Sequence, residues 1–345
     1  MKKLVRDPEQ FDVLELFSNM GASLGYDIRD PTSQDDFIKR VRGSLELIKK
    51  KCTVVHGQRT EALFAYVIGA LGKVVLLNQE DAGDVFFAGE NILVPDYRLT
   101  FENGSQLMVE VKNCHQRNPE ANITITKDYF NKLFRYAEIN QVKLKFAVLY
   151  SRWNKWCLLG INVFEEHDDC YKINMLDALK SNEMAMLGDL MVGAAPNLEI
   201  HVLADPVDDS EIDENGLARF VIKEIKLFCM EKEIVNEHER KLALFIMQHG
   251  DWHESEPEAF VVNNKFYGVR FIYSPKQQEE PNFAIIGNLS SMVTNAYKDH
   301  TVENGEVKAL KVGFDPAVFE IFIPEDYAGE RLPLWRFQMC PPNDA

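Results

Sequence analysis

The sequence lacks the features of a membrane protein and of a secreted disulfide scaffold. No apolar run reaches the roughly 20 residues that a membrane-spanning helix needs. The first seven residues lead into an acidic stretch instead of the apolar segment of a signal peptide. The 6 cysteines are scattered without a Cys-x-x-Cys pair, which fits a reducing compartment better than a disulfide framework. These absences predict a cytoplasmic protein without a membrane anchor.

Basic residues are also scarce, because 38 lysines and arginines stand against 54 aspartates and glutamates, for a net charge of −16. Residues 1–195 hold 24 basic and 27 acidic residues, a net of −3, whereas residues 196–345 hold 14 and 27, a net of −13. An acidic surface repels a phosphate backbone, so any nucleic-acid surface is expected in the first half. The second half is expected to contact a protein partner, form a homodimer interface or bind a small regulatory ligand.

Length and hydrophobic patterning predict an N-terminal helical segment at residues 1–54 and two domains, at residues 55–195 and 196–345. The expected helices and strands follow from periodicity and turn signals. Helices are expected at 11–24, 34–51, 60–71, 125–141, 175–191, 236–249 and 284–297. Strands are expected at 73–78, 92–101, 106–113, 142–150, 155–161, 198–204, 220–228, 260–262, 266–271, 307–312 and 319–323, and an acidic loop at 208–211.

The most informative feature is the pair Pro95-Asp96, followed fourteen residues after the aspartate by Glu110-Val111-Lys112. Two carboxylates can hold a divalent cation that polarises a phosphodiester and its attacking water, and a lysine can orient or activate that water. The predicted strands at 92–101 and 106–113 are joined by a turn whose Asn-Gly is a strong hairpin signal. Side chains alternate along a strand, so Glu110 and Lys112 should share a face that Asp96 can meet from the partner strand.

Each part of this pattern also has an ordinary structural explanation. Glu-x-Lys is common on solvated strand faces, and Pro-Asp is a common turn pair. Against this, Glu110 lies in an otherwise apolar strand, where a buried charge is costly without a partner. The combination therefore favours a functional site.

These residues resemble the PD-(D/E)xK nuclease superfamily, the restriction-endonuclease-like fold that includes Holliday-junction resolvases and many DNA-repair nucleases. The resemblance covers roughly residues 55–160 and is carried by an acidic helix, a hairpin, Glu-x-Lys and a basic helix, in that order. It implies an α/β fold whose core is a mixed central sheet flanked by helices, with residues 196–345 as a second, α+β domain.

The resemblance also implies roles for individual residues. Asp96 and Glu110 would bind magnesium, the carbonyl of Val111 would supply a further ligand, and Lys112 would be catalytic. Glu61, on the helix before the core strands, would complete the set. Its alternative explanation is local, because a carboxylate in the first turn after a Thr60 cap is favoured by the helix dipole whatever the function.

Residues expected to contact the substrate surround this motif, since basic side chains follow the Glu-x-Lys strand and recur on the helix at 125–141. RecB-like members carry Gln-x-x-x-Tyr on that helix, where this chain has Lys132 and Tyr136, and the lysine argues against that branch. A solvated helix face would explain the same basic cluster. The expected substrate-binding residues are Arg59, Asn113, Lys127, Lys132, Arg135 and Tyr136.

Taken together, the residues and the resemblance predict a nuclease that depends on Mg²⁺, with Mn²⁺ as a substitute. DNA is the expected substrate, because most members of the family act on DNA in restriction or defence, repair or junction processing. RNA stays open, since nothing in the sequence reads a 2′-hydroxyl. The alternative from another class is a nuclease-like fold that serves as a binding or scaffold protein with an idle site.

Overall fold

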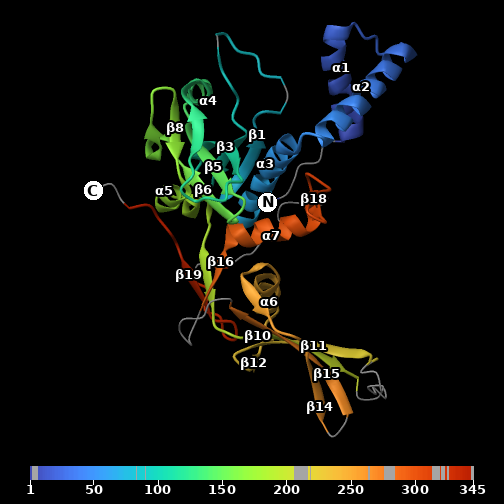
Figure 1. The fold of residues 1–345 in the computed structure, drawn as a ribbon, viewed down its shortest axis with the longest axis vertical. Coiled ribbons are helices and arrows are strands. Elements are labelled where there is room, and N and C mark those ends of the chain that lie inside the picture. The colour runs from blue at the N-terminus through green and yellow to red at the C-terminus, as the bar shows by residue number, and fades with distance from the viewer. Residues whose placement is uncertain are drawn as a thin grey trace.

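The protein is an α/β protein, and its computed structural model (Figure 1) describes most of the chain. The described residues are 1, 7–82, 84–89, 91–205, 217, 219–262, 265–275, 284–312, 319, 323–324 and 326–342. Among them, no helix is both long enough and apolar enough to cross a membrane. The cysteines whose side chains are described are all free, namely Cys114, Cys157, Cys170, Cys229 and Cys340.

The helices are α1 (Val13–Leu24), α2 (Pro31–Lys49), α3 (Cys52–Leu71), α4 (Lys127–Ile139), α5 (Met175–Lys180), α6 (Glu237–His249) and α7 (Leu289–Thr301). The strands of the first half are β1 (Val74–Gln79), β2 (Tyr97–Phe101), β3 (Gln106–Cys114), β4 (Ile123–Thr126), β5 (Lys143–Tyr150), β6 (Lys155–Leu159), β7 (Glu165–Glu166), β8 (Cys170–Ile173) and β9 (Met191–Ala194). Those of the second half are β10 (Leu198–Ala204), β11 (Ile222–Cys229), β12 (Lys232–Glu233), β13 (Trp252–Glu254), β14 (Glu258–Val262), β15 (Lys265–Pro275), β16 (Ala284–Asn288), β17 (Val302–Glu303), β18 (Glu306–Val307) and β19 (Leu334–Phe337).

A five-stranded sheet in the order β1-β2-β3-β5-β6 forms the centre of the first half. It is mixed, because β3 and β5 are parallel while the other neighbours are antiparallel. Side chains of β5 alternate between two cores: Ala147 and Leu149 join the core that contains the buried residues of α3, and Phe146, Val148 and Tyr150 join the core that contains those of α4. The sheet is therefore covered by α3 on one face and α4 on the other.

The hairpin between β2 and β3 has the predicted turn at residues 102–105. Gly104 has a φ of 79°, a conformation that glycine adopts without steric cost, and the side chain of Asn103 accepts a hydrogen bond from the Ser105 N–H at 3.0 Å. The predicted start of the first strand at residue 92 is wrong, since β2 begins at Tyr97. Pro95 has no N–H to donate to a neighbouring strand, so Asp96 lies just outside the strand.

Three predicted helix boundaries are also wrong. The helix predicted from Thr60 begins at Cys52, and the Thr60 hydroxyl bonds to the His56 carbonyl at 2.8 Å inside α3. The helix predicted at 175–191 ends at Lys180, because the Asn182 side chain accepts hydrogen bonds from Leu158 and Met184 N–H and ties the chain to β6. The helix predicted at 284–297 begins at Leu289, since residues 284–288 pair with β9 instead.

Smaller differences concern short strands. Residues 123–126 pair with β8 before α4 begins, and only the first residue of the strand predicted at 307–312 lies in a strand, β18. The acidic loop predicted at 208–211 lies outside the described residues, as do all but the two ends of the strand predicted at 319–323.

The second half is built on an antiparallel sheet in which β10 lies between β11 and β15. It meets the first half through α7, which lies between the first sheet and α6 in Figure 1. One hydrophobic core contains Leu63 of α3, Leu242 of α6 and Tyr297 of α7, and β9 pairs with both β16 and β19. The two halves therefore share a core.

Candidate metal centre

Asp96 and Glu110 meet where β2 and β3 pair. Tyr97 lies opposite Val109 in the antiparallel register, so Asp96 is placed opposite Glu110. Asp96 is only 8% exposed, and its Oδ2 accepts a hydrogen bond of 2.6 Å from the Val111 N–H. The predicted meeting of these residues across the hairpin is found, although Asp96 precedes the strand.

Glu110 is held by two side chains on its own face of the sheet. Its Oε1 accepts hydrogen bonds from Lys112 Nζ at 2.6 Å and from the Tyr129 hydroxyl at 2.5 Å. Lys112 also bonds to the Tyr129 hydroxyl at 2.8 Å and lies 4.6 Å from the centre of its ring. The prediction that Glu110 and Lys112 share a face is confirmed, and their contact compensates the charge of a residue that is 4% exposed.

Three further carboxylates crowd together beside this pair. Oxygens of Glu61, Asp81 and Asp96 all lie within 4.8 Å of one another. Asp96 is buried, Glu61 partly buried and Asp81 exposed, so the cluster opens to solvent on one side. Among the residues that the structure describes, no lysine, arginine or histidine forms an ion pair with any of the three.

Burial and the proximity of these acids raise the pKa values of Asp96 and Glu61. Burial, and then the charge of Glu110, raise the pKa of Asp96 to about 8, although the Val111 N–H acts in the opposite direction. Burial and the charges of Asp81 and Glu110 also raise the pKa of Glu61. The folded chain therefore holds at least one carboxyl that is unfavourable to ionise unless positive charge is brought to it.

The contact with Glu110 also raises the pKa values of Lys112 and Tyr129. Burial alone would lower the pKa of Lys112, but the charge and hydrogen bond of Glu110 outweigh it and raise the pKa. Burial and Glu110 raise the pKa of Tyr129 to about 12. Lys112 is therefore an ammonium and Tyr129 a neutral hydroxyl at neutral pH.

The donor set fits a hard divalent cation. Oxygen ligands from carboxylates are those that Mg²⁺ and Mn²⁺ prefer, and the exposed side of the cluster leaves room for water ligands. Glu61, Asp81 and Asp96 could hold such an ion, and Glu110 could join them through Oε2, which accepts no hydrogen bond from a described residue. Val111 lies in the site through its N–H, which binds Asp96.

Sequence reasoning missed Asp81 and Tyr129. Asp81 lies between the strands expected at 73–78 and 92–101, and the sequence alone predicts no role for it. The signal that could have found it is strand register: Gln79 pairs with Tyr97, and the Glu80 N–H donates to the Asp96 carbonyl at 2.9 Å, so the next residue arrives beside Asp96. Tyr129 lies on α4 and offers no comparable signal, because its contact with β3 depends on how the helix packs.

The basic residues predicted on α4 are each engaged by a neighbouring carboxylate. Lys127 pairs with Glu166 at 2.6 Å, Lys132 with Asp128 at 2.7 Å and Arg135 with Glu138 at 3.5 Å. The hydroxyl of Tyr136 donates to Glu80 at 2.9 Å, beside the ion pair of Glu80 with Arg98.

The other two predicted substrate-binding residues lie in different surroundings. Arg59 donates to the Thr301 hydroxyl at 2.9 Å and lies over the Tyr297 ring, so its side chain joins α3 to α7. Asn113 is exposed near the end of β3, one residue beyond Lys112. The structure thus brings Glu61, Asp96, Glu110 and Lys112 together and directs Arg59 elsewhere.

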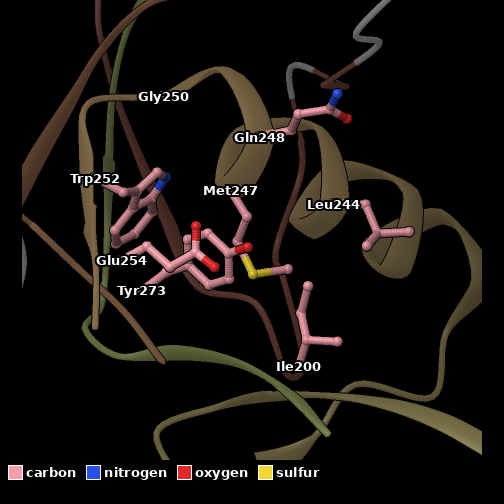
Figure 2. A pocket seen from close by; sticks show the side chains of 8 residues that line it. All are labelled: Ile200, Leu244, Met247, Gln248, Gly250, Trp252, Glu254 and Tyr273. Atoms are coloured by element: carbon pink, nitrogen blue, oxygen red, sulfur yellow. The ribbon is translucent and has the colours of Figure 1, made fainter. Parts of the chain in front are cut away.

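A separate cavity of about 410 Å³ lies in the second half, between α6 and the sheet of β10, β13 and β15 (Figure 2). Met247, Glu254 and Tyr273 gather near one another in this view, and Leu244 lies farther along α6. The full lining is Ile200, Leu244, Met247, Gln248, Gly250, Trp252, Glu254 and Tyr273. None of these residues belongs to the carboxylate cluster.

Comparisons with known proteins add little to this geometry. No protein-family model matches the chain, and no curated protein sequence matches it. The 1.6 Å structure of Archaeoglobus fulgidus Hjc, a Holliday junction resolvase from an archaeal hyperthermophile, is similar over 27% of this chain and 77% of its own, with 18% sequence identity and a TM-score of 0.22. The proposals below therefore rest on the site itself.

Proposed function

We propose that this protein is a divalent-metal-dependent nuclease that hydrolyses phosphodiester bonds, with DNA as its substrate. The observation that carries the proposal is the convergence of three carboxylates that form no ion pair with a described cation, Glu61, Asp81 and Asp96, beside the pair formed by Glu110 and Lys112. Clustered acids of this kind are unfavourable without a cation, and a lysine beside them is suited to a phosphate or its attacking water.

Glu61, Asp81 and Asp96 would hold Mg²⁺ or Mn²⁺, with Glu110 as a further ligand. When bound, the ion would polarise the scissile phosphate and lower the pKa of a bound water. The buried Asp96 is oriented by the Val111 N–H, whereas Asp81 is on the solvent side, where substrate and water enter.

Lys112 is proposed to position the attacking water or the phosphate. Its ammonium is anchored by Glu110 and Tyr129, both within 2.8 Å, so its position is restricted before substrate arrives. Tyr129 also keeps Glu110 in place, since its hydroxyl donates to the same oxygen and accepts a hydrogen bond from Lys112. The two residues together act as a fixed support for one face of the site.

A restriction-endonuclease-like core within residues 55–195 is part of the proposal, with residues 196–345 as an added α+β domain. Support comes from the order α3, β1, β2, β3, β4, α4, β5, in which β4 pairs with β8 outside the central sheet, and from a mixed central sheet with a helix on each face. The proposed site residues lie on α3, on the loop between β1 and β2, and on β3, all within the residues 55–160 that carry the resemblance.

The direct test is cleavage of supercoiled plasmid and of labelled single strands of DNA and RNA in Mg²⁺, Mn²⁺ or EDTA. We expect cleavage in either metal and none in EDTA. Asp96→Asn should abolish it while the fold is retained, because the amide keeps the acceptor for Val111 but loses the charge that binds metal. Asp84→Asn is the matched control, since Asp84 is an exposed acid of the same loop outside the cluster.

Wild-type protein that binds DNA but cuts no substrate in either metal would favour the binding or scaffold alternative with an idle site. Cleavage of RNA alone would reassign the substrate. A folded Asp96→Asn protein that cuts at the wild-type rate would overturn the metal centre, and thermal melts must accompany the assay to establish folding.

A further inference from the structure

Two groups of basic residues lie near the metal centre, and they differ in their partners. The basic residues of α4 are paired with carboxylates, so a phosphate would have to displace those partners. Beyond the ends of β3 and β5, Arg117 and Arg152 are exposed and form no ion pair with any residue that the structure describes. Free guanidinium groups are better placed to meet a phosphate backbone.

Parallel strand pairing brings this second group together. Cys114 and Tyr150, the last residues of β3 and β5, are register partners. The next residues are also joined: His115 Nδ1 lies 2.9 Å from the Ser151 hydroxyl, and the Ser151 N–H donates to the Cys114 carbonyl at 2.9 Å. His115 and Arg152 therefore leave the sheet at the same end.

Side chains from three segments contribute to one positively charged surface there. Burial, followed by the positive charges of Arg152, His56 and Arg117, lowers the pKa of His115. All four residues are exposed, and Trp153, next to Arg152 in the turn, is 45% exposed. We call these five residues, His56, His115, Arg117, Arg152 and Trp153, the strand-end patch.

Two elements lead from the metal centre to the strand-end patch. Along α3, Glu61 and His56 are five residues apart, which corresponds to about 7.5 Å of helix. Along β3 and its extension, Glu110 and His115 are also five residues apart, which corresponds to about 17 Å of extended chain. A nucleic-acid strand spans such distances in about two to five nucleotides.

We propose that the strand-end patch binds the backbone of a nucleic-acid strand a few nucleotides from the metal centre, and that Trp153 stacks on an unpaired base of that strand. The exposed cations match phosphates, and an exposed tryptophan beside an arginine matches the stacking platforms of single-strand binding sites. The location of the scissile bond at the metal centre rests on the proposed function; binding by the patch does not.

The second half of the chain holds this patch in position. Asn154, in the same turn as Arg152 and Trp153, donates to the Ser291 carbonyl at 3.0 Å and to the Asn295 side chain at 2.9 Å on α7. The Ser291 hydroxyl returns a hydrogen bond of 2.6 Å to the Asn154 carbonyl. The acidic second half, which is poorly suited to hold phosphate, can thus order the turn that carries Arg152 and Trp153.

The test measures binding separately from cleavage, by fluorescence anisotropy of labelled single-stranded and duplex DNA with full-length protein in EDTA. Arg117→Glu with Arg152→Glu should weaken binding about tenfold or more at low salt and lower the salt slope by about two. The α4 control is Lys132→Glu with Arg135→Glu, two residues that the sequence alone predicts to bind substrate. It makes the same charge change, and because both cations already pair with carboxylates it should weaken binding less than the 117/152 pair does. Lysine at positions 117 and 152 should restore binding.

Trp153→Ala should weaken single-strand binding about fivefold or more, with a smaller effect on duplex. Affinity of the folded 117/152 charge-reversal protein equal to wild type would overturn the patch, as would a larger loss in the α4 control. Unchanged single-strand affinity in Trp153→Ala would overturn the stacking. If the wild-type protein cuts no substrate but the patch variants lose binding, the patch is supported and the proposed function is rejected. If the wild-type protein cuts in a metal-dependent way but the patch variants bind normally, the proposed function is supported and the patch is rejected.

Discussion

The metal centre has two sides that differ in whether a cation contacts the carboxylates: one side holds Glu110, and the other holds Glu61, Asp81 and Asp96. Glu110 is almost fully buried, yet an ammonium and a hydroxyl both contact one of its oxygens. Oxygens of Glu61, Asp81 and Asp96 lie within 4.8 Å of one another, but no cation among the described residues pairs with them. The negative charge of Glu110 is compensated by Lys112, and we call this the compensated side; the charges of the other three acids have no such partner, and we call theirs the uncompensated side.

This difference is more informative than the number of acids. A chain with a net charge of −16 has carboxylates over much of its surface, most of them screened by solvent. What distinguishes the uncompensated side is that buried Asp96 carries a raised pKa and still has acidic neighbours. A group held in that state is a candidate for function, because a bound cation would relieve it.

Removal of Lys112 is the largest perturbation predicted for the side that holds Glu110, because it leaves the Glu110 carboxylate without a cation, as Glu61, Asp81 and Asp96 are. Lys112→Met should slow single-turnover cleavage about 10²–10³-fold, the range for loss of one positioned electrostatic donor. It should also lower the free energy of unfolding by about 1–3 kcal/mol, since Glu110 loses its charged partner. Lys112→Arg, which keeps the charge, should lose less stability. Wild-type cleavage and stability in Lys112→Met would contradict the assigned role.

Neutralising Asp81 tests the uncompensated side. Asp81→Asn should weaken Mn²⁺ binding about tenfold or more, measured by isothermal titration, because it removes a ligand. Asp84→Asn, an exposed acid of the same loop, should leave Mn²⁺ affinity unchanged. Equal affinities in the two variants would remove Asp81 from the site.

Tyr129→Phe makes a smaller change to the compensated side. The substitution removes the hydroxyl that bonds Glu110 and Lys112 but keeps the ring beneath the ammonium. Urea unfolding should show a loss of about 1–2 kcal/mol. Tyr136→Phe, which removes a hydroxyl bonded to Glu80, is the control and should cost less, because that pair is less tightly enclosed. A larger loss in the control would reverse this ranking.

The last prediction concerns the pH dependence of stability without metal. The folded-state pKa of Asp96 is raised to about 8 from an ordinary value of 3.8, so between these values the folded chain holds a proton that the unfolded chain has released. The stability contributed by this proton is present at low pH and is lost as pH rises through about 8. In EDTA, the melting temperature of wild type relative to Asp96→Asn should therefore fall between about pH 5.5 and about pH 8.5.

Mn²⁺ should flatten this pH dependence, because the ion replaces the proton at the site. A melting-temperature difference that rises with pH in EDTA would show that the Asp96 carboxyl is stabilised as an anion by the chain alone, contrary to the comparison of the two sides.

Much of the first half could be predicted from local pattern. The strands at β1, β3 and β5, the Asn-Gly hairpin and α4 were predicted within a few residues, because alternation, helical periodicity and turn residues are properties of short segments. The helix predicted at 284–297 was wrong in its first turn because residues 284–288 pair with β9, about ninety residues away in the sequence. No local propensity carries that information.

The residues of the candidate site also fall into those that local spacing predicts and those whose contacts depend on tertiary packing. Glu110 and Lys112 lie two residues apart on one strand, so their shared face follows from the period of the strand. Arg59 is among the residues expected to bind substrate, and the structure places its side chain against Tyr297 and Thr301 of α7. The charges on α4 were recognised correctly, and the carboxylates that pair with them could not be assigned from spacing alone.

By itself, the sequence determined which residues could form a site: the acids, the lysine and the strand that presents them, since side-chain chemistry and strand period are local. Only the tertiary structure decided that Asp81 joins Glu61 and Asp96, and that Arg117 and Arg152 remain without carboxylate partners among the described residues. These outcomes depend on strand register and on the packing of α3, α4 and α7, which bring together residues far apart in the chain. Coulomb energy falls with distance through space, so that packing sets which charges interact.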